Sequence, residues 1–155
     1  MADVQRLVRI YGCMLDYYFF PAGFRLPVSL FNGFVNDHHS EPWAVEKKVK
    51  FLTSEKKMYN EEWFVAGTAD AVVEIDGKKY IADWKTGKGV YYEAFIQTAA
   101  YRGMLEAMGE KDFHGSLVLH IPQKGLLTEH YRFDYETDLR AFEHALGLYR
   151  IINSI

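Results

Sequence analysis

Residues 67–85 read GTADAVVEIDGKKYIADWK, and this stretch decides the fold that we expect. Two runs rich in β-forming residues flank Asp76-Gly77, and an Asp-Gly pair in that position is the strongest short-range signal for a β-hairpin. A two-residue loop places Ile75 opposite Lys78. Continuing that register along the two strands places Asp70 directly opposite Asp83. The sequence therefore predicts two carboxylates that face each other across one hairpin.

Facing carboxylates need a compensating charge. Directly opposed residues have Cβ atoms roughly 4.5 to 5.5 Å apart, and like charges at that separation destabilise a sheet. A divalent cation bound between Asp70 and Asp83 would offset the repulsion, and hard oxygen ligands suit Mg²⁺ or Mn²⁺. Lys85 lies two residues beyond Asp83, so strand alternation sends its ammonium to the same face. Two carboxylates, a cation and a lysine are a minimal set for metal-assisted hydrolysis of a phosphodiester.

The rest of the chain alternates between helical and extended patterns. Apolar residues recur with helical spacing from Val4 to a helix end near Pro21, and residues 21–42 form an irregular connection with Pro and Gly. Beyond it the patterns predict a strand over 43–51, a polar turn over 54–60, strands over 63–75 and 79–85, a helix over 90–108, strands over 116–121 and 130–133, and a helix over 139–152.

Composition excludes several classes of protein. The single cysteine, Cys13, rules out an intrachain disulfide, a four-thiolate zinc site and an iron–sulfur cluster built from this chain alone. No apolar run is long enough for a membrane span, and the N-terminus lacks the layout of a signal peptide, so we expect an intracellular, cytoplasmic protein without a membrane partner. The net charge is −3, but nine lysines concentrate in the middle third. Nucleic-acid contacts and ordinary solvated strand faces explain that enrichment equally well.

Three motifs resemble one known family. Gly67-x-x-Asp70, then Asp83-Trp84-Lys85, then Gln97 with Tyr101 are similar to the PD-(D/E)XK nuclease superfamily, in its RecB-like exonuclease branch without an iron–sulfur cluster (phage-type). The resemblance implies an α/β fold with a restriction-endonuclease-like core, in which helices flank a central mixed β-sheet in the order α-β-β-β-α-β-β-α. It implies one nuclease-like domain over residues 1–155.

The resemblance also assigns roles to residues. Asp70 and Asp83 would bind Mg²⁺ or Mn²⁺ together with the backbone carbonyl of Trp84, and Lys85 would serve the attacking water. Gln97 and Tyr101, four apart on one helical face, would brace this site or contact DNA.

Four further residues have a less direct link to the resemblance. Glu46 resembles a glutamate that joins the metal site from the preceding strand, although an exposed strand glutamate explains it equally well. Lys88 is a candidate DNA contact. Relatives often carry a metal-binding histidine on an N-terminal helix, but the first predicted helix has none, and we interpret His38 and His39 as loop residues. Either the site uses fewer ligands, or the chain lacks the histidine-bearing helix.

The leading hypothesis is therefore a metal-dependent deoxyribonuclease, an exonuclease by resemblance, that acts on DNA in recombination, repair or replication. It would be intracellular, with a virus-encoded source open, and could work as a homo-oligomer or within a larger complex. A second hypothesis is a nucleic-acid-binding domain of the same fold without turnover. A third is a structural ion-pair cluster of Asp70, Asp83 and Lys85, which leaves two acids with one cation.

Overall fold

The structure is a computed structural model that describes residues 41–86, 88–122 and 124–153. Its helices and strands follow one another along the chain as α3 (Glu41–Glu46), β1 (Lys50–Asn60), β2 (Val65–Ile75), β3 (Lys78–Lys85), α4 (Tyr92–Ala107), β4 (Phe113–His120), β5 (Thr128–Arg132) and α5 (Tyr135–Asn153). The predicted N-terminal helix, Cys13, His38 and His39 lie outside the described residues.

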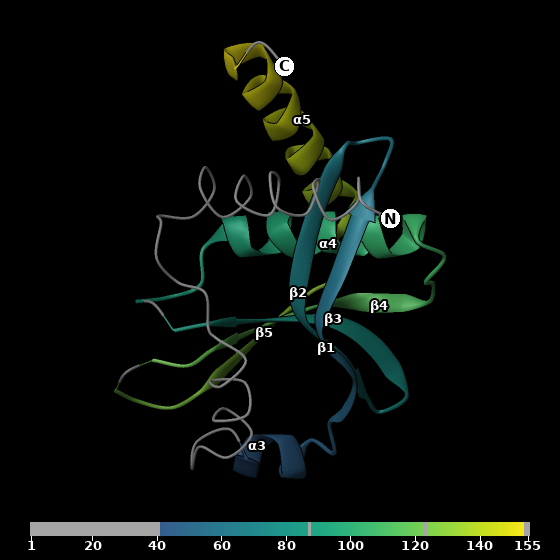
Figure 1. The fold of residues 1–155 in the computed structure, drawn as a ribbon. Coiled ribbons are helices and arrows are strands. Elements are labelled where there is room, and N and C mark those ends of the chain that lie inside the picture. The colour runs from purple at the N-terminus through teal and green to yellow at the C-terminus, as the bar shows by residue number, and fades with distance from the viewer. Residues whose placement is uncertain (1–40, 87, 123, 154–155) are drawn as a thin grey trace.

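The five strands form one mixed sheet in the order β1-β2-β3-β4-β5. Strands β3 and β4 run parallel, because α4 carries the chain from one to the other, and the remaining neighbours are antiparallel. Helix α4 crosses one face of the sheet, and α5 packs against α4 (Figure 1). The predicted α/β class, with helices flanking a central mixed sheet, is confirmed, and the order of elements is close to the prediction.

One apolar cluster packs on each face of the sheet. Under α4 and α5, side chains of β1, β2 and β3 pack with both helices around residues such as Val72, Ile81 and Phe142. On the opposite face, Trp43 of α3 packs with β2, β3 and β4. The indole N–H of Trp43 donates to Glu129, and Lys47 forms an ion pair of 3.2 Å with the same carboxylate, so α3 is attached to β5.

The predicted hairpin is confirmed. Asp76 and Gly77 have φ values of 50° and 71°, as a type I′ turn requires at both central positions. The register runs from Ile75–Lys78 to Ala71–Ala82 as expected. The paired positions end there, one step before Asp70 and Asp83.

Two local predictions are wrong. Residues 43–46 belong to α3 rather than to a strand. Val45, which the alternating pattern placed on the buried face of a strand, is 72% exposed. The polar segment 54–60 is the second half of β1 rather than a turn. A register shift between Phe51 and Thr53 and a left-handed backbone at Glu55 interrupt the alternation on which the prediction relied.

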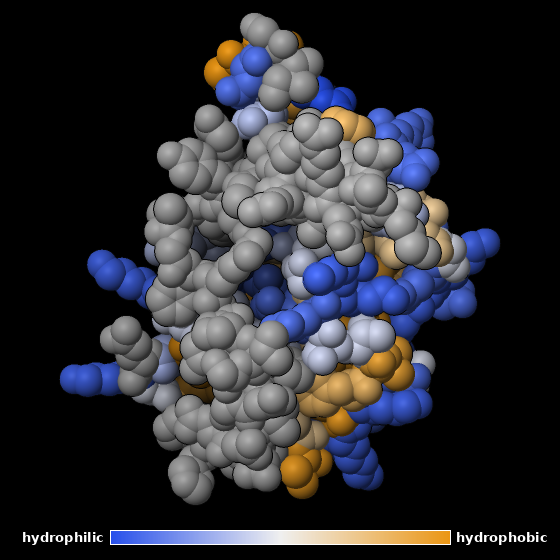
Figure 2. Space-filling view, viewed as in Figure 1, coloured by the Kyte–Doolittle hydropathy of each residue, from blue (hydrophilic) through white to orange (hydrophobic). Residues whose placement is uncertain are grey.

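The outer surface of β1 explains why its sequence looked like a loop. Lys50, Ser54 and Lys57 are exposed, and burial begins only near the end of the strand, at Met58. Figure 2 shows hydrophilic atoms gathered across the middle of the view. Within the described residues, no helix combines the length and apolar character needed to cross a membrane.

Candidate active site

Three acidic residues occupy corresponding positions on three adjacent strands. Ser54 pairs with Ala71 and Lys56 with Ala69, so Glu55 of β1 stands opposite Asp70 of β2. The β2–β3 pairs end at Ala71–Ala82, and one step further in the same register Asp70 comes opposite Asp83 of β3, whose charge acts on it. We call Glu55, Asp70 and Asp83 the carboxylate row. The register argument predicted its second and third members.

Glu55 is the member that the sequence analysis missed. Its φ of 47° lies in the left-handed region, where residues other than glycine are uncommon and where functional residues are often held. The resemblance placed this role on Glu46, but Glu46 is an exposed residue at the end of α3, whose Trp43 packs on the opposite face of the sheet. The prediction that Glu46 lies on the strand preceding the hairpin is therefore wrong.

Asp70 is in an unfavourable place for a negative charge. Its pKa is raised to about 7, first because it is buried and second because the charge of Asp83 lies close to it. The backbone N–H of Trp84 donates to Asp70 Oδ2 at 2.9 Å and, with the charge of Lys85, lowers the pKa, whereas Glu55 raises it further. Among the described residues, burial and the neighbouring acids therefore outweigh Lys85 and the Trp84 N–H in setting the pKa of Asp70.

Lys85 connects the carboxylate row to α4. Its Nζ lies 2.8 Å from Asp83 Oδ2 and donates to Gln97 Oε1 at 2.9 Å. Gln97 Nε2 donates in turn to the hydroxyl of Tyr101 at 2.6 Å. Asp83, Gln97 and Tyr101 are 3%, 7% and 4% exposed, so the contacts form in a largely water-excluded interior. The structure thus brings together Asp83, Lys85, Gln97 and Tyr101, all of which were candidate site residues.

Gly67 makes room for this arrangement. A Cβ at Gly67 would lie 3.0 Å from Cε1 of Tyr101 and 3.3 Å from Cε of Met104. The glycine of the Gly67-x-x-Asp70 motif therefore lets the ring of Tyr101 lie on β2. The first and third motifs of the chain are linked by this contact.

The remaining predicted residues lie at the edge of the site. The indole of Trp84 packs in the opposite-face cluster, so only the backbone of Trp84 serves the carboxylate row, and the role of its carbonyl stays a prediction. Lys88 is exposed in the connection between β3 and α4.

A cation at this site would have two nearby carboxylates as ligands, those of Asp70 and Asp83. Across residues 41–86, 88–122 and 124–153, no group of three or more His, Cys, Asp or Glu side chains is arranged to hold a metal ion. Asp70 and Asp83 remain as a carboxylate pair. Mg²⁺ is commonly bound by one or two carboxylates, with water and substrate phosphate completing its shell. The pair fits such an ion, because the carboxylates of Asp70 and Asp83 lie close enough for each charge to act on the other.

Comparisons with known proteins assign no function to the chain. No protein-family model and no curated protein matches the chain. Among solved structures that match, one titled "Crystal structure of SSO0001" has 15% sequence identity and a TM-score of 0.41, and the match covers 79% of this chain. It covers 62% of that protein, so this chain spans less than two thirds of its length.

Proposed function

We propose that this chain is a Mg²⁺- or Mn²⁺-dependent deoxyribonuclease that hydrolyses phosphodiester bonds. The observation that carries the proposal is the position of Lys85, whose ammonium lies between Asp83 and Gln97 beside the raised-pKa carboxyl of Asp70. In metal-assisted phosphodiester hydrolysis, carboxylates can hold the ion while a neighbouring lysine offsets the negative charge that develops on the phosphate.

Each residue has a defined part in this proposal. Asp70 and Asp83 would hold the ion with the carbonyl of Trp84, and Glu55 would support them from β1. A bound ion would polarise the phosphate and lower the pKa of a water. Lys85 would orient that water and offset the negative charge that develops on the phosphate.

Gln97 and Tyr101 would act through Lys85 rather than on the substrate. Gln97 holds the ammonium of Lys85 through its amide oxygen, and the hydroxyl of Tyr101 fixes the amide nitrogen. The Lys85 side chain is thereby kept in one conformation before substrate arrives, which lowers the cost of ordering it during the reaction.

A nucleic-acid-binding domain without turnover is the second candidate. The 2.8 Å ion pair between Lys85 and Asp83 favours this second candidate, because the ammonium can take the place of a metal ion as the counter-charge of Asp83. A purely structural cluster of Asp70, Asp83 and Lys85 is the third candidate, and it leaves the buried Asp70 close to the charge of Asp83.

The biological setting belongs to the proposal as well. Exonuclease action and a role in DNA recombination, repair or replication come from the family resemblance, as do an intracellular site of action and assembly into an oligomer or larger complex. DNA is the proposed partner.

A cleavage assay tests the proposal. Purified protein is incubated with end-labelled linear single- and double-stranded DNA in Mg²⁺, Mn²⁺ or EDTA. Lys85→Ala is compared with Lys78→Ala, a matched change at an exposed position of the same strand. We expect metal-dependent cleavage that Lys78→Ala retains and Lys85→Ala loses. Cleavage in EDTA, or cleavage that survives Lys85→Ala, contradicts the proposal, and metal-dependent DNA binding without cleavage supports the second candidate.

A further inference from the structure

Tyr91 occupies a position that its side chain does not help to stabilise. It is the N-cap residue of α4, with φ −109° and ψ 161°, and it makes no side-chain capping hydrogen bond. Helix N-caps favour Ser, Thr, Asp and Asn, whose oxygens accept a bond from the first turn. The ring of Tyr91 is also 64% exposed, so it adds little to the core. A residue that breaks a local rule without a packing gain is a candidate for a function.

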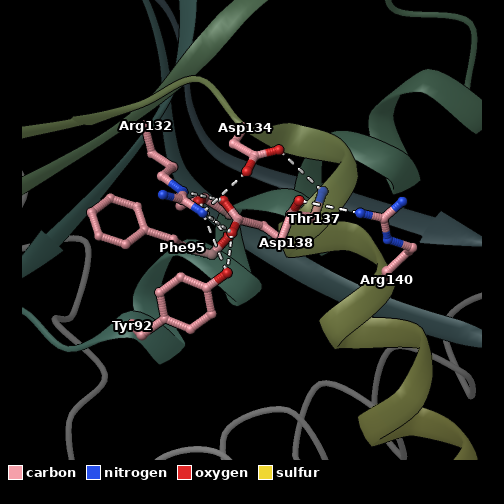
Figure 3. A network of polar contacts seen from close by, with 8 residues as sticks. Tyr92, Phe95, Arg132, Asp134, Thr137, Asp138 and Arg140 are labelled. Atoms are coloured by element: carbon pink, nitrogen blue, oxygen red, sulfur yellow. Dashed lines mark hydrogen bonds and ion pairs between the residues drawn. The ribbon is translucent and has the colours of Figure 1, made fainter.

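Tyr92, the next residue, anchors this end of α4. Its hydroxyl donates to Asp138 Oδ1 at 2.6 Å, and Arg132 donates to both oxygens of the same carboxylate at 2.9 Å. The guanidinium of Arg132 also lies 5.3 Å from the centroid of the Tyr92 ring. Figure 3 shows Tyr92 of α4 and Arg132 of β5 meeting at Asp138 of α5. The start of α4 is therefore fixed to two other elements, and Tyr91 extends from a rigid base.

The distance along α4 between Tyr91 and the residue that contacts Lys85 can be compared with the spacing of nucleotides. Gln97, which contacts Lys85, lies six residues further along α4, or about 9 Å along the helix axis. That length equals the rise of about two to three stacked nucleotides. Lys88, three residues before Tyr91, is exposed in the same connection. Exposed cations that contact phosphates and exposed aromatic rings that stack on bases are the combination that binds single-stranded nucleic acid, and Lys88 and Tyr91 supply one of each within four residues.

We propose that Tyr91 is a stacking platform for an unpaired nucleobase, about two to three nucleotides from the phosphodiester that lies at Lys85. Paired bases inside a duplex have both faces covered by their neighbours, so the ring would select a single strand or a frayed end. The location of the scissile bond rests on the proposed function, whereas the stacking itself does not.

The test measures binding without cleavage. All variants are made in the full Lys85→Ala chain and are titrated in EDTA, at one fixed salt concentration, with a labelled thymidine oligonucleotide and with a matched duplex. Tyr91→Ser removes the ring and introduces a favoured N-cap residue, and Tyr91→Trp keeps a ring. Phe64→Ser, at another exposed aromatic beside the β1–β2 turn, is the matched control.

We expect Tyr91→Ser to weaken single-strand binding by about 5- to 150-fold, while Tyr91→Trp and Phe64→Ser retain it and duplex binding changes less. The thermal midpoint of Tyr91→Ser should be equal or higher, because serine caps the helix better. This combination separates stacking from a structural role, which would lower both binding and stability.

Single-strand binding that Tyr91→Ser leaves unchanged overturns the proposal, as does a parent protein that binds no single strand. A change of oligomeric state in light scattering with retained single-strand binding would assign the ring to a protein contact instead, and it also overturns the proposal. Because no cleavage is measured, a failure of the proposed nuclease function leaves this test intact.

Discussion

Lys85 of β3 donates a hydrogen bond of 2.9 Å to Gln97 of α4, and this contact joins the carboxylate row to the helix that covers it. The two residues are far enough apart that no local pattern sets their distance. The α4 crossover places them together, so the geometry of the site depends on how α4 crosses the sheet.

Gln97→Ala should lower the rate of DNA cleavage by about 10- to 100-fold, the range typical of residues that orient a site residue from behind. The physical reason is the loss of the bond that fixes Lys85, so kcat should fall more than KM rises. Steady-state kinetics on a labelled oligonucleotide measures both constants. An unchanged kcat would show that Lys85 needs no support from α4.

Gly67→Ala should destabilise the fold by about 1–3 kcal/mol, because the new Cβ would crowd Tyr101 and Met104. Gly147→Ala is the matched control. Gly147 lies in α5, where a Cβ would meet no atom within 4 Å, so we expect the free energy of unfolding to rise by about 0.5–1 kcal/mol. Urea unfolding of the two variants measures both changes. Equal stabilities would contradict the close approach of Tyr101 to β2.

Stability should depend on pH through Asp70. Its pKa is about 7 in the folded chain and near 3.8 when it is unperturbed, so the folded state holds more protons between those values. The free energy of unfolding in EDTA should therefore fall as pH rises from about 4 to about 7. Asp70→Asn removes the titrating group and should flatten that part of the profile. Parallel profiles for native protein and Asp70→Asn would remove Asp70 as the cause.

Glu55→Gln should raise the Mn²⁺ concentration that gives half-maximal cleavage by about tenfold or more, since it takes one charge from the carboxylate row. Glu46→Gln, the matched change in α3, should leave that concentration unchanged. The reverse ranking would restore the role that the resemblance gave to Glu46.

The sequence predicted what local chemistry determines. Asp76-Gly77 set the turn, and the turn set the register, which the structure follows as far as Ala71–Ala82, one step before Asp70 and Asp83. Helical spacing likewise located α4 and α5. These features need only neighbouring residues or a two-residue loop.

The parts that the sequence did not predict depend on tertiary contacts. β1 carries a polar outer surface and a register shift, so its alternation was lost and Glu55 stayed hidden within it. One signal was present, since Glu55-Lys56-Lys57 is followed by Met58 and Tyr59, which favour a strand. α3 forms because Trp43 finds both an apolar cluster and Glu129, which lies 86 residues away in the chain.

Calorimetric titration of Mn²⁺ into metal-free protein tests the central claim most directly, because it measures the carboxylate pair without requiring turnover. We predict one binding site in the native chain, stronger at pH 8 than at pH 6 because Asp70 must lose its proton, and lost in Asp70→Asn and in Asp83→Asn. No binding by the native chain, or binding by Asp70→Asn and Asp83→Asn as strong as that of the native chain, would contradict the proposed metal site.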